Sequence, residues 1–111
     1  MKRLRNKADK LLQQKYVKGR CEVCGKQAQV AHHIVPKSQS NNLRYDPDNI
    51  AILCNACHFA HHTKGDPKII SKIIEIRGLE FIEELQKRRY QICKFNKGYL
   101  EEVINELENK N

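Results

Sequence analysis

Two pairs of cysteines and a group of histidines are the residues of this sequence whose types and spacing indicate chemistry. Cys21 and Cys24 form one Cys-x-x-Cys pair, and Cys54 and Cys57 form a second. Four thiolates at this spacing complete a tetrahedral zinc site. The histidines are not needed for that site, so their number and clustering imply a second, reactive metal centre. They are His32, His33, His58, His61 and His62.

The histidines that follow the second cysteine pair have helical spacing. His58 and His62 are four residues apart, so on a helix both imidazoles project from one face and can bind one ion. His61 is three residues from His58 and competes for this role, but we favour His62. The alternative is that these side chains are extra zinc ligands or solvated helix residues.

His32 and His33 are neighbours in a segment that is rich in Val and Ile. On a strand such neighbours point to opposite faces, so one can complete the metal site while the other addresses a substrate. Metal-assisted hydrolysis of a phosphodiester requires this division, with a cation beside the phosphate and a neutral imidazole that deprotonates the attacking water. General-base assistance is typically worth about 10²- to 10⁴-fold in rate.

Hydrophobic spacing and turn residues predict the elements that must position these side chains. In the first half of the chain we expect a helix over Ala8–Val17, a strand over Ala28–Val35, a polar loop over Pro36–Pro47, a short strand over Ile50–Leu53 and a helix through His62.

The second half of the chain reads as helical. Asp66 is a candidate cap for a helix that begins at Pro67 and ends before Gly78. A further helix carries Phe81, Ile82, Leu85 and Ile92 on its apolar side, and the last covers Tyr99–Leu107. Cys93 falls in the second of these helices and is expected to be a small core residue.

The charge of the chain indicates a polyanionic partner. Lys and Arg outnumber Asp and Glu by 21 to 13, a net charge of +8, and residues 1–20 alone carry +7 against −3 for residues 99–111. An excess of this size on a small domain favours nucleic acid. No segment has the apolar length of a signal peptide or of a membrane span, and cysteines used as metal ligands favour a reducing cytoplasm.

Three segments resemble the HNH endonucleases, whose core is a ββα-metal unit. They are Ala31-His32-His33-Ile34-Val35-Pro36, Pro47-Asp48-Asn49-Ile50 and Leu53-Cys54-Asn55-Ala56-Cys57-His58, and the resemblance covers about Cys21 to His62. It implies His32 and His58 as metal ligands, His33 as general base and Asn49 as the residue that orients the loop bearing the base. His62 matches the third ligand histidine of some members.

The resemblance also sets the expected fold, partner and cofactors. The fold class is α+β: one nuclease domain over residues 1–111, with a zinc-stapled HNH core at about 20–64, an N-terminal helix, and a helical extension at about 66–111. DNA, duplex or branched, is the expected partner. We expect phosphate contacts from Arg20, Lys37, Arg44, Arg88 and Arg89.

Two metals are expected, a structural Zn²⁺ and a catalytic divalent cation. Many HNH proteins carry Asp where His32 stands, and an imidazole there shifts the preference from Mg²⁺ toward Mn²⁺, Ni²⁺ or Zn²⁺.

A narrower similarity links Ala8-Asp9-Lys10 and the run from Arg44 to Phe59 to the NinG/Rap recombination proteins of lambdoid phages, which implies cutting of branched intermediates. Symmetrical cutting of a junction needs two active sites, which favours a homodimer. A role with phage packaging proteins fits the same core. Two other classes compete with the enzyme: a zinc-stabilised DNA-binding module without activity, and a protein adaptor that uses the acidic C-terminal helix.

Overall fold

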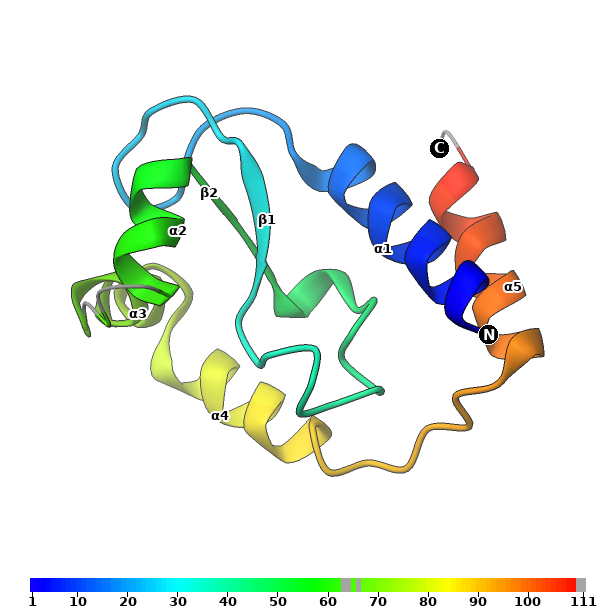
Figure 1. Cartoon of the computed structure of the whole chain (residues 1–111). Coiled ribbons are helices and arrows are strands. Elements are labelled where there is room, and N and C mark those ends of the chain that lie inside the picture. Colours follow the sequence, from blue (N-terminus) through cyan, green and yellow to red (C-terminus); the bar gives the residue numbers. More distant parts are fainter. Residues whose placement is uncertain (63–64, 66, 110–111) are drawn as a thin grey trace.

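A computed structural model describes residues 1–62, 65 and 67–109, and at His62 it describes the backbone alone. Helices flank a short antiparallel hairpin, with α1 and α5 on one side and α2, α3 and α4 on the other (Figure 1). This arrangement confirms the predicted α+β class. The elements are α1 (Lys2–Tyr16), β1 (Val30–His33), the 3-10 turn η1 (Pro47–Asn49), β2 (Ile50–Leu53), α2 (Asn55–His62), α3 (Pro67–Arg77), α4 (Leu79–Arg88) and α5 (Lys97–Glu108).

The hairpin divides the interior of the molecule into two cores. Its register pairs Ala31 with Ile52, and because side chains alternate along a strand, successive residues of β2 enter different cores. Ala51 and Leu53 join the first core with α3 and α4, which we call the cysteine-side core. Its buried members are Cys21, Ile34, Val35, Leu43, Ala51, Leu53, Cys54, Ile69, Ile73, Ile82 and Leu85.

The second core, which we call the helix-side core, lies between the opposite face of the hairpin and the pair α1 and α5. Leu12 and Leu100 are its largest fully buried side chains, and Ile50 reaches it from β2. It has no cysteine among its described members, so apolar packing is its main source of stability. Its buried members are Ala8, Leu12, Ala31, Tyr45, Ile50, Leu100, Val103 and Ile104.

Polar side chains attach the hairpin to both flanks at the same pair of residues. On β1, the Gln13 amide of α1 donates to the Ala31 carbonyl at 2.8 Å and accepts from the Ala31 N–H at 2.9 Å. On β2, Glu22 donates its backbone N–H to the Ile52 carbonyl, and its carboxylate accepts from the Ile52 N–H at 2.8 Å. Arg77 of α3 holds the same carboxylate at 2.9 Å.

The structure corrects the predicted limits of two helices. Helix α1 begins at Lys2 rather than Ala8, because Leu4 extends the apolar side that packs on the helix-side core. Helix α4 ends at Arg88, so Ile92 and Cys93 lie outside it, Ile92 is 98% exposed and Cys93 is half-buried in a loop. The predictions of a core position for Ile92 and of a helical core position for Cys93 were therefore wrong.

The end of α4 is set by contacts from a distant loop. The Asn42 side chain donates to the carbonyl of Arg88 at 2.8 Å, and the Ser40 hydroxyl donates to the carbonyl of Arg89 at 3.2 Å. These side chains satisfy carbonyls that a continuing helix would have used. The predicted cap at Asp66 lies outside the described residues. None of the helices that the structure describes is long and apolar enough to cross a membrane.

Candidate functional site

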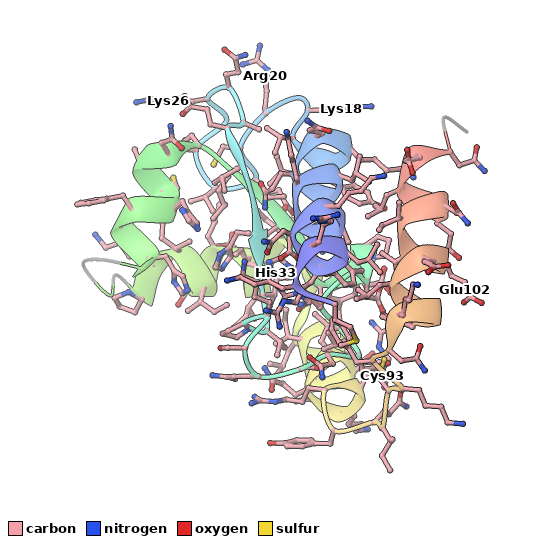
Figure 2. All side chains as sticks on the ribbon, turned by 45° about the vertical axis from the view of Figure 1, so that its right-hand side comes forward. Lys18, Arg20, Lys26, His33, Cys93 and Glu102 are labelled. Carbon is pink, nitrogen blue, oxygen red and sulfur yellow. The ribbon has the colours of Figure 1, made fainter. Side chains whose placement is uncertain are left out.

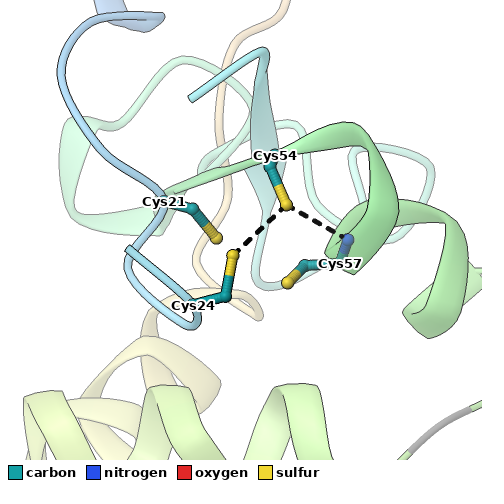
Figure 3. Close-up of side chains that lie close together, drawn as sticks. All are labelled: Cys21, Cys24, Cys54 and Cys57. Atoms are coloured by element: carbon teal, nitrogen blue, oxygen red, sulfur yellow. Dashed lines mark hydrogen bonds between the residues drawn. The ribbon is translucent and has the colours of Figure 1, made fainter. Parts of the chain in front are cut away.

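The four paired cysteines converge on one point, as Figure 3 shows. Cys21 and Cys24 come from the turn before β1, Cys54 follows β2, and Cys57 lies in the first turn of α2. One sulfur from each residue lies within 4.8 Å of the other three, and the sulfurs of Cys24 and Cys54 are 3.5 Å apart. The four cysteines are therefore positioned to bind a metal ion such as zinc.

The surroundings favour the thiolate at Cys21 and Cys54, whereas burial raises the pKa of Cys57. Burial opposes ionisation of Cys21, but hydrogen bonds from the backbone of Cys24, Cys54 and Val23 lower its pKa to about 7. The backbone N–H of Cys57 also points at the sulfur of Cys54, at 3.5 Å. Four sulfur donors are the soft set that zinc accepts in a closed tetrahedral site.

A cluster of imidazoles lies on the same side of the hairpin, between β1 and α2. His32 is 3% exposed, and its ring centroid is 5.4 Å from that of His58 and 4.9 Å from that of His61. The prediction that favoured His62 falls on a side chain outside the described part of the chain. The structure thus brings together His32 and His58, as expected, and places His61 beside them.

His33 points away from this cluster and into the contact of β1 with the loop that follows it. Its Nε2 lies 2.8 Å from the backbone carbonyl of Arg44. A carbonyl oxygen only accepts hydrogen bonds, so Nε2 carries the hydrogen and the lone pair of the neutral ring is on Nδ1. Burial lowers the pKa of His33, and the charges of Lys37 and Arg44 act in the same direction, although the Arg44 carbonyl and Asp9 oppose it. The balance favours a neutral imidazole.

A hollow of about 470 Å³ lies between the imidazole cluster and His33. His32, His33 and His58 all contribute to its lining, and Lys37 stands beside them. The hollow therefore offers an imidazole cluster, a separate imidazole and a cation to one bound group. Its further described lining residues are Gln13, Val30, Ala31, Pro36 and Ser38.

Asn49 closes the loop that follows β1. Its side chain is fully buried; it accepts from the Val35 N–H at 2.7 Å and donates to the carbonyls of Val35 at 2.9 Å and Leu43 at 3.2 Å. The amide thus holds the backbone two residues beyond His33, rather than His33 itself, and fixes the loop on which Arg44 lies.

Helix α1 supplies a contact that the sequence interpretation missed. The Arg44 guanidinium donates to both carboxylate oxygens of Asp9, at 3.0 and 2.6 Å, while the carbonyl of the same Arg44 accepts from His33. Asp9 and Gln13 are four residues apart on the side of α1 that carries Ala8 and Leu12. The sequence signal for these contacts is the position of Asp9 and Gln13 directly beside the buried apolar side of the helix.

The residues predicted to bind phosphate have different surroundings. Lys37 lines the hollow, and Arg20 is exposed near Lys18 and Lys26, at the opposite end of the view in Figure 2 from Cys93. Two of the predicted cations are held by carboxylates, Arg44 by Asp9 and Arg88 by Asp46 at 2.8 Å and Asp48 at 3.3 Å. Arg89 binds the neutral side chains of Gln39 and Gln86.

Comparison with known proteins matches residues 21–64 to the family model of the HNH endonucleases. No curated protein and no solved structure gives a significant match. The matched segment carries both cysteine pairs and all the histidines described above, and the narrower similarity to NinG/Rap proteins stays a prediction. With the cysteine cluster, the match supports the HNH family for residues 21–64 and indicates a nuclease or DNA-binding function.

Proposed function

We propose that residues 1–111 form a single metal-dependent HNH endonuclease domain that hydrolyses phosphodiester bonds in DNA. One observation carries the proposal: the hollow lined by His32 and His58 is also lined by His33, whose Nε2 donates to the Arg44 carbonyl. A binding module would have no use for a neutral imidazole with an acceptor nitrogen beside a cluster of further imidazoles.

The donor chemistry of the imidazole cluster suits a divalent transition metal. His32 and His58 would hold the ion, with a third imidazole from the end of α2, His61 or His62. Nitrogen donors of this kind suit Mn²⁺, Ni²⁺ or Zn²⁺ better than Mg²⁺. A cation bound there supplies stabilisation of the negative charge that develops on the phosphate and on the leaving 3′ oxygen.

The chain's own residues account for the proton transfer. The Nδ1 atom of His33 takes a proton from water as the water oxygen attacks phosphorus and the bond from phosphorus to the 3′ oxygen breaks. The Arg44 carbonyl keeps the proton of the imidazole on Nε2, so the accepting atom is fixed at Nδ1. Lys37, in the lining of the same hollow, would pair with a phosphate oxygen.

The test incubates supercoiled and branched DNA with zinc-loaded protein and Mg²⁺, Mn²⁺ or Ni²⁺. We expect cutting by the parent protein with Mn²⁺ or Ni²⁺ and a loss of about 10²- to 10⁴-fold in His33→Ala, with DNA binding retained. Wild-type cutting by His33→Ala would refute the base assignment. Metal-independent binding without any cutting would refute the nuclease.

The third ligand is tested by a matched pair of variants. His61→Ala and His62→Ala remove one imidazole each from adjacent positions of α2. The true ligand is the one whose loss weakens Mn²⁺ binding, measured by calorimetry on zinc-loaded protein. Equal Mn²⁺ affinity of both variants and the parent would exclude a third ligand from this end of α2.

A further inference from the structure

The loop between α4 and α5 exposes two large apolar side chains at its start. Tyr90 is 78% exposed and Ile92 is 98% exposed, the two highest values among the large hydrophobic residues that the structure describes. Full burial of such a side chain is worth roughly 1.5–3 kcal/mol, so exposing both on one short segment forgoes stability. We call residues 89–94 the tip. Neighbouring exposed apolar residues of this kind mark a contact surface.

The tip is held in place on its N-terminal side rather than hanging from flexible chain. Besides the contacts of Ser40 and Asn42 with the end of α4, the Arg89 guanidinium binds the Gln39 side chain at 2.7 Å. The backbone of the tip also forms a turn, in which the Gln91 N–H donates to the Arg88 carbonyl. The same 36–46 loop carries Lys37 into the hollow, so the tip is braced against the segment that borders the proposed site.

The other side of the tip is fixed by aromatic packing. The Phe95 ring is nearly parallel to the Tyr45 ring, with 6.4 Å between the ring centroids, and its centroid lies 5.6 Å from that of the Tyr99 ring. Phe95 therefore ties the end of the tip to the helix-side core, while Tyr90 and Ile92 face solvent. Tyr90 and Ile92 are therefore exposed on a loop that is held in place on both sides.

The segment of sequence that contains the tip carries charge of one sign. Residues 86–100 contain five basic residues and no acidic residue. Arg88 is neutralised by Asp46 and Asp48, but the guanidinium of Arg89 lies over the Tyr90 ring at 5.1 Å and has amide partners. An aromatic ring and an aliphatic side chain among cations match a polyanion that also offers flat apolar faces. Nucleic acid with unstacked bases has this combination.

We propose that the tip is a second DNA contact, in which Tyr90 stacks on, and Ile92 wedges beside, bases that are already unstacked, while Arg89 and Lys94 meet the flanking phosphates. The inference rests on the proposed function for its choice of DNA. It names the substrate class as duplexes with a local distortion, such as a bulge or a branch, because an intact stack must first be opened at a cost of a few kcal/mol per step.

The test measures binding separately from cutting. Full-length, zinc-loaded His33→Ala protein is titrated into a labelled duplex and into the same duplex with a central bulge, with and without Tyr90→Ser and Ile92→Ser. We expect the double substitution to weaken bulge binding about tenfold and duplex binding much less. Leu79→Ser, at the other end of α4 and 58% exposed, is the matched control and should leave both affinities unchanged.

A second measurement reports the contact directly. 2-Aminopurine placed beside the bulge should change its fluorescence on binding of the parent protein, and this change should disappear in Tyr90→Ser. Bulge affinity unchanged by the double substitution, or equal losses on both DNAs, would overturn the proposal. So would a change from dimer to monomer on sedimentation, which would make a second copy of the chain the occupant of the tip.

Failure of this inference is distinct from failure of the proposed function. If the parent protein cuts DNA but the tip variants bind bulged DNA normally, the nuclease proposal stands and the tip proposal fails. If the parent protein never cuts DNA but the tip variants lose bulge binding, the tip proposal stands and the nuclease proposal fails.

Discussion

The two faces of the hairpin are stabilised by different means. On the cysteine side, apolar residues pack around four converging sulfurs that are positioned for a metal. On the helix side, α1 and α5 pack on the hairpin through aliphatic and aromatic side chains, with Gln13 and Asp9 as polar attachments. His32 faces the first region and His33 depends on the second. In the proposed enzyme, the metal ligands and the base therefore rely on separate parts of the fold.

Removal of the structural metal should produce the largest effect. Structural zinc can supply on the order of 10–16 kcal/mol of apparent folding free energy, more than the net stability of most small domains. We expect chelation to abolish the cooperative thermal transition and to remove amide-exchange protection first from β2 and α2, because Cys54 lies between these elements and Cys57 lies in the first turn of α2. An unchanged melting temperature, with elemental analysis showing that zinc has left, would contradict a metal-dependent cysteine side.

Asn49→Ala should produce the next largest effect, at the junction of the two regions. The substitution leaves the backbone N–H and carbonyl of Val35 and the carbonyl of Leu43 without their buried partner. We expect a loss of about 3 kcal/mol in the free energy of unfolding, measured by urea titration of the zinc-loaded protein. Asn42→Ala, whose bonds are partly solvated, is the control. A loss below that of the control would show that the loop after β1 holds its course without Asn49.

Asp9→Ala tests the helix side through the base. Without its carboxylate partner, the Arg44 guanidinium keeps only its bond to the Tyr45 hydroxyl, so the Arg44 carbonyl that orients His33 is held less firmly. We expect the cleavage rate at saturating DNA to fall about tenfold, as for other partners that orient a catalytic group, with zinc content unchanged.

A double-substitution cycle separates orientation from general damage. If Asp9 acts through His33, then Asp9→Ala should cost nothing further in a His33→Ala background. An equal loss in both backgrounds would mean that Asp9 only supports the fold. The ¹⁵N shifts of the His33 ring give a readout without activity, because they report which nitrogen carries the hydrogen.

Much of this arrangement could be predicted from local sequence signals. The cysteine spacing indicated the metal cluster, and the limits of β2 and the start of α3 at Pro67 were predicted as observed. The contact of Asp9 with Arg44 joins residues 35 positions apart, and the contact of Ser40 with Arg89 joins residues 49 apart. Periodicity carries no information on such pairs, so the orientation of His33 and the end of α4 became visible only in the structure.

The smallest expected effect concerns the surface charges on the helix side. Lys7 and Glu108 lie 4.0 Å apart, but their side chains are 55% and 50% exposed. Exposed pairs of this kind contribute about 0–1 kcal/mol. Lys7→Gln should therefore leave the unfolding free energy within that range, in contrast to a core substitution such as Leu12→Ala, which should cost about 2–5 kcal/mol. A larger effect of Lys7→Gln would mean that charge, rather than packing, joins α1 to α5.

The attachments of Gln13 to Ala31 and of Glu22 to Ile52 have a consequence for self-association. Isolated hairpins present outward-facing backbone groups that can template an additional strand and begin aggregation. Here Gln13 of α1 hydrogen-bonds the outward-facing backbone groups of Ala31 at the β1 edge, and Glu22 of the first cysteine turn hydrogen-bonds those of Ile52 at the β2 edge. A dimer of this protein would therefore have to form through helices or loops, because strand addition is blocked at the centre of both edges.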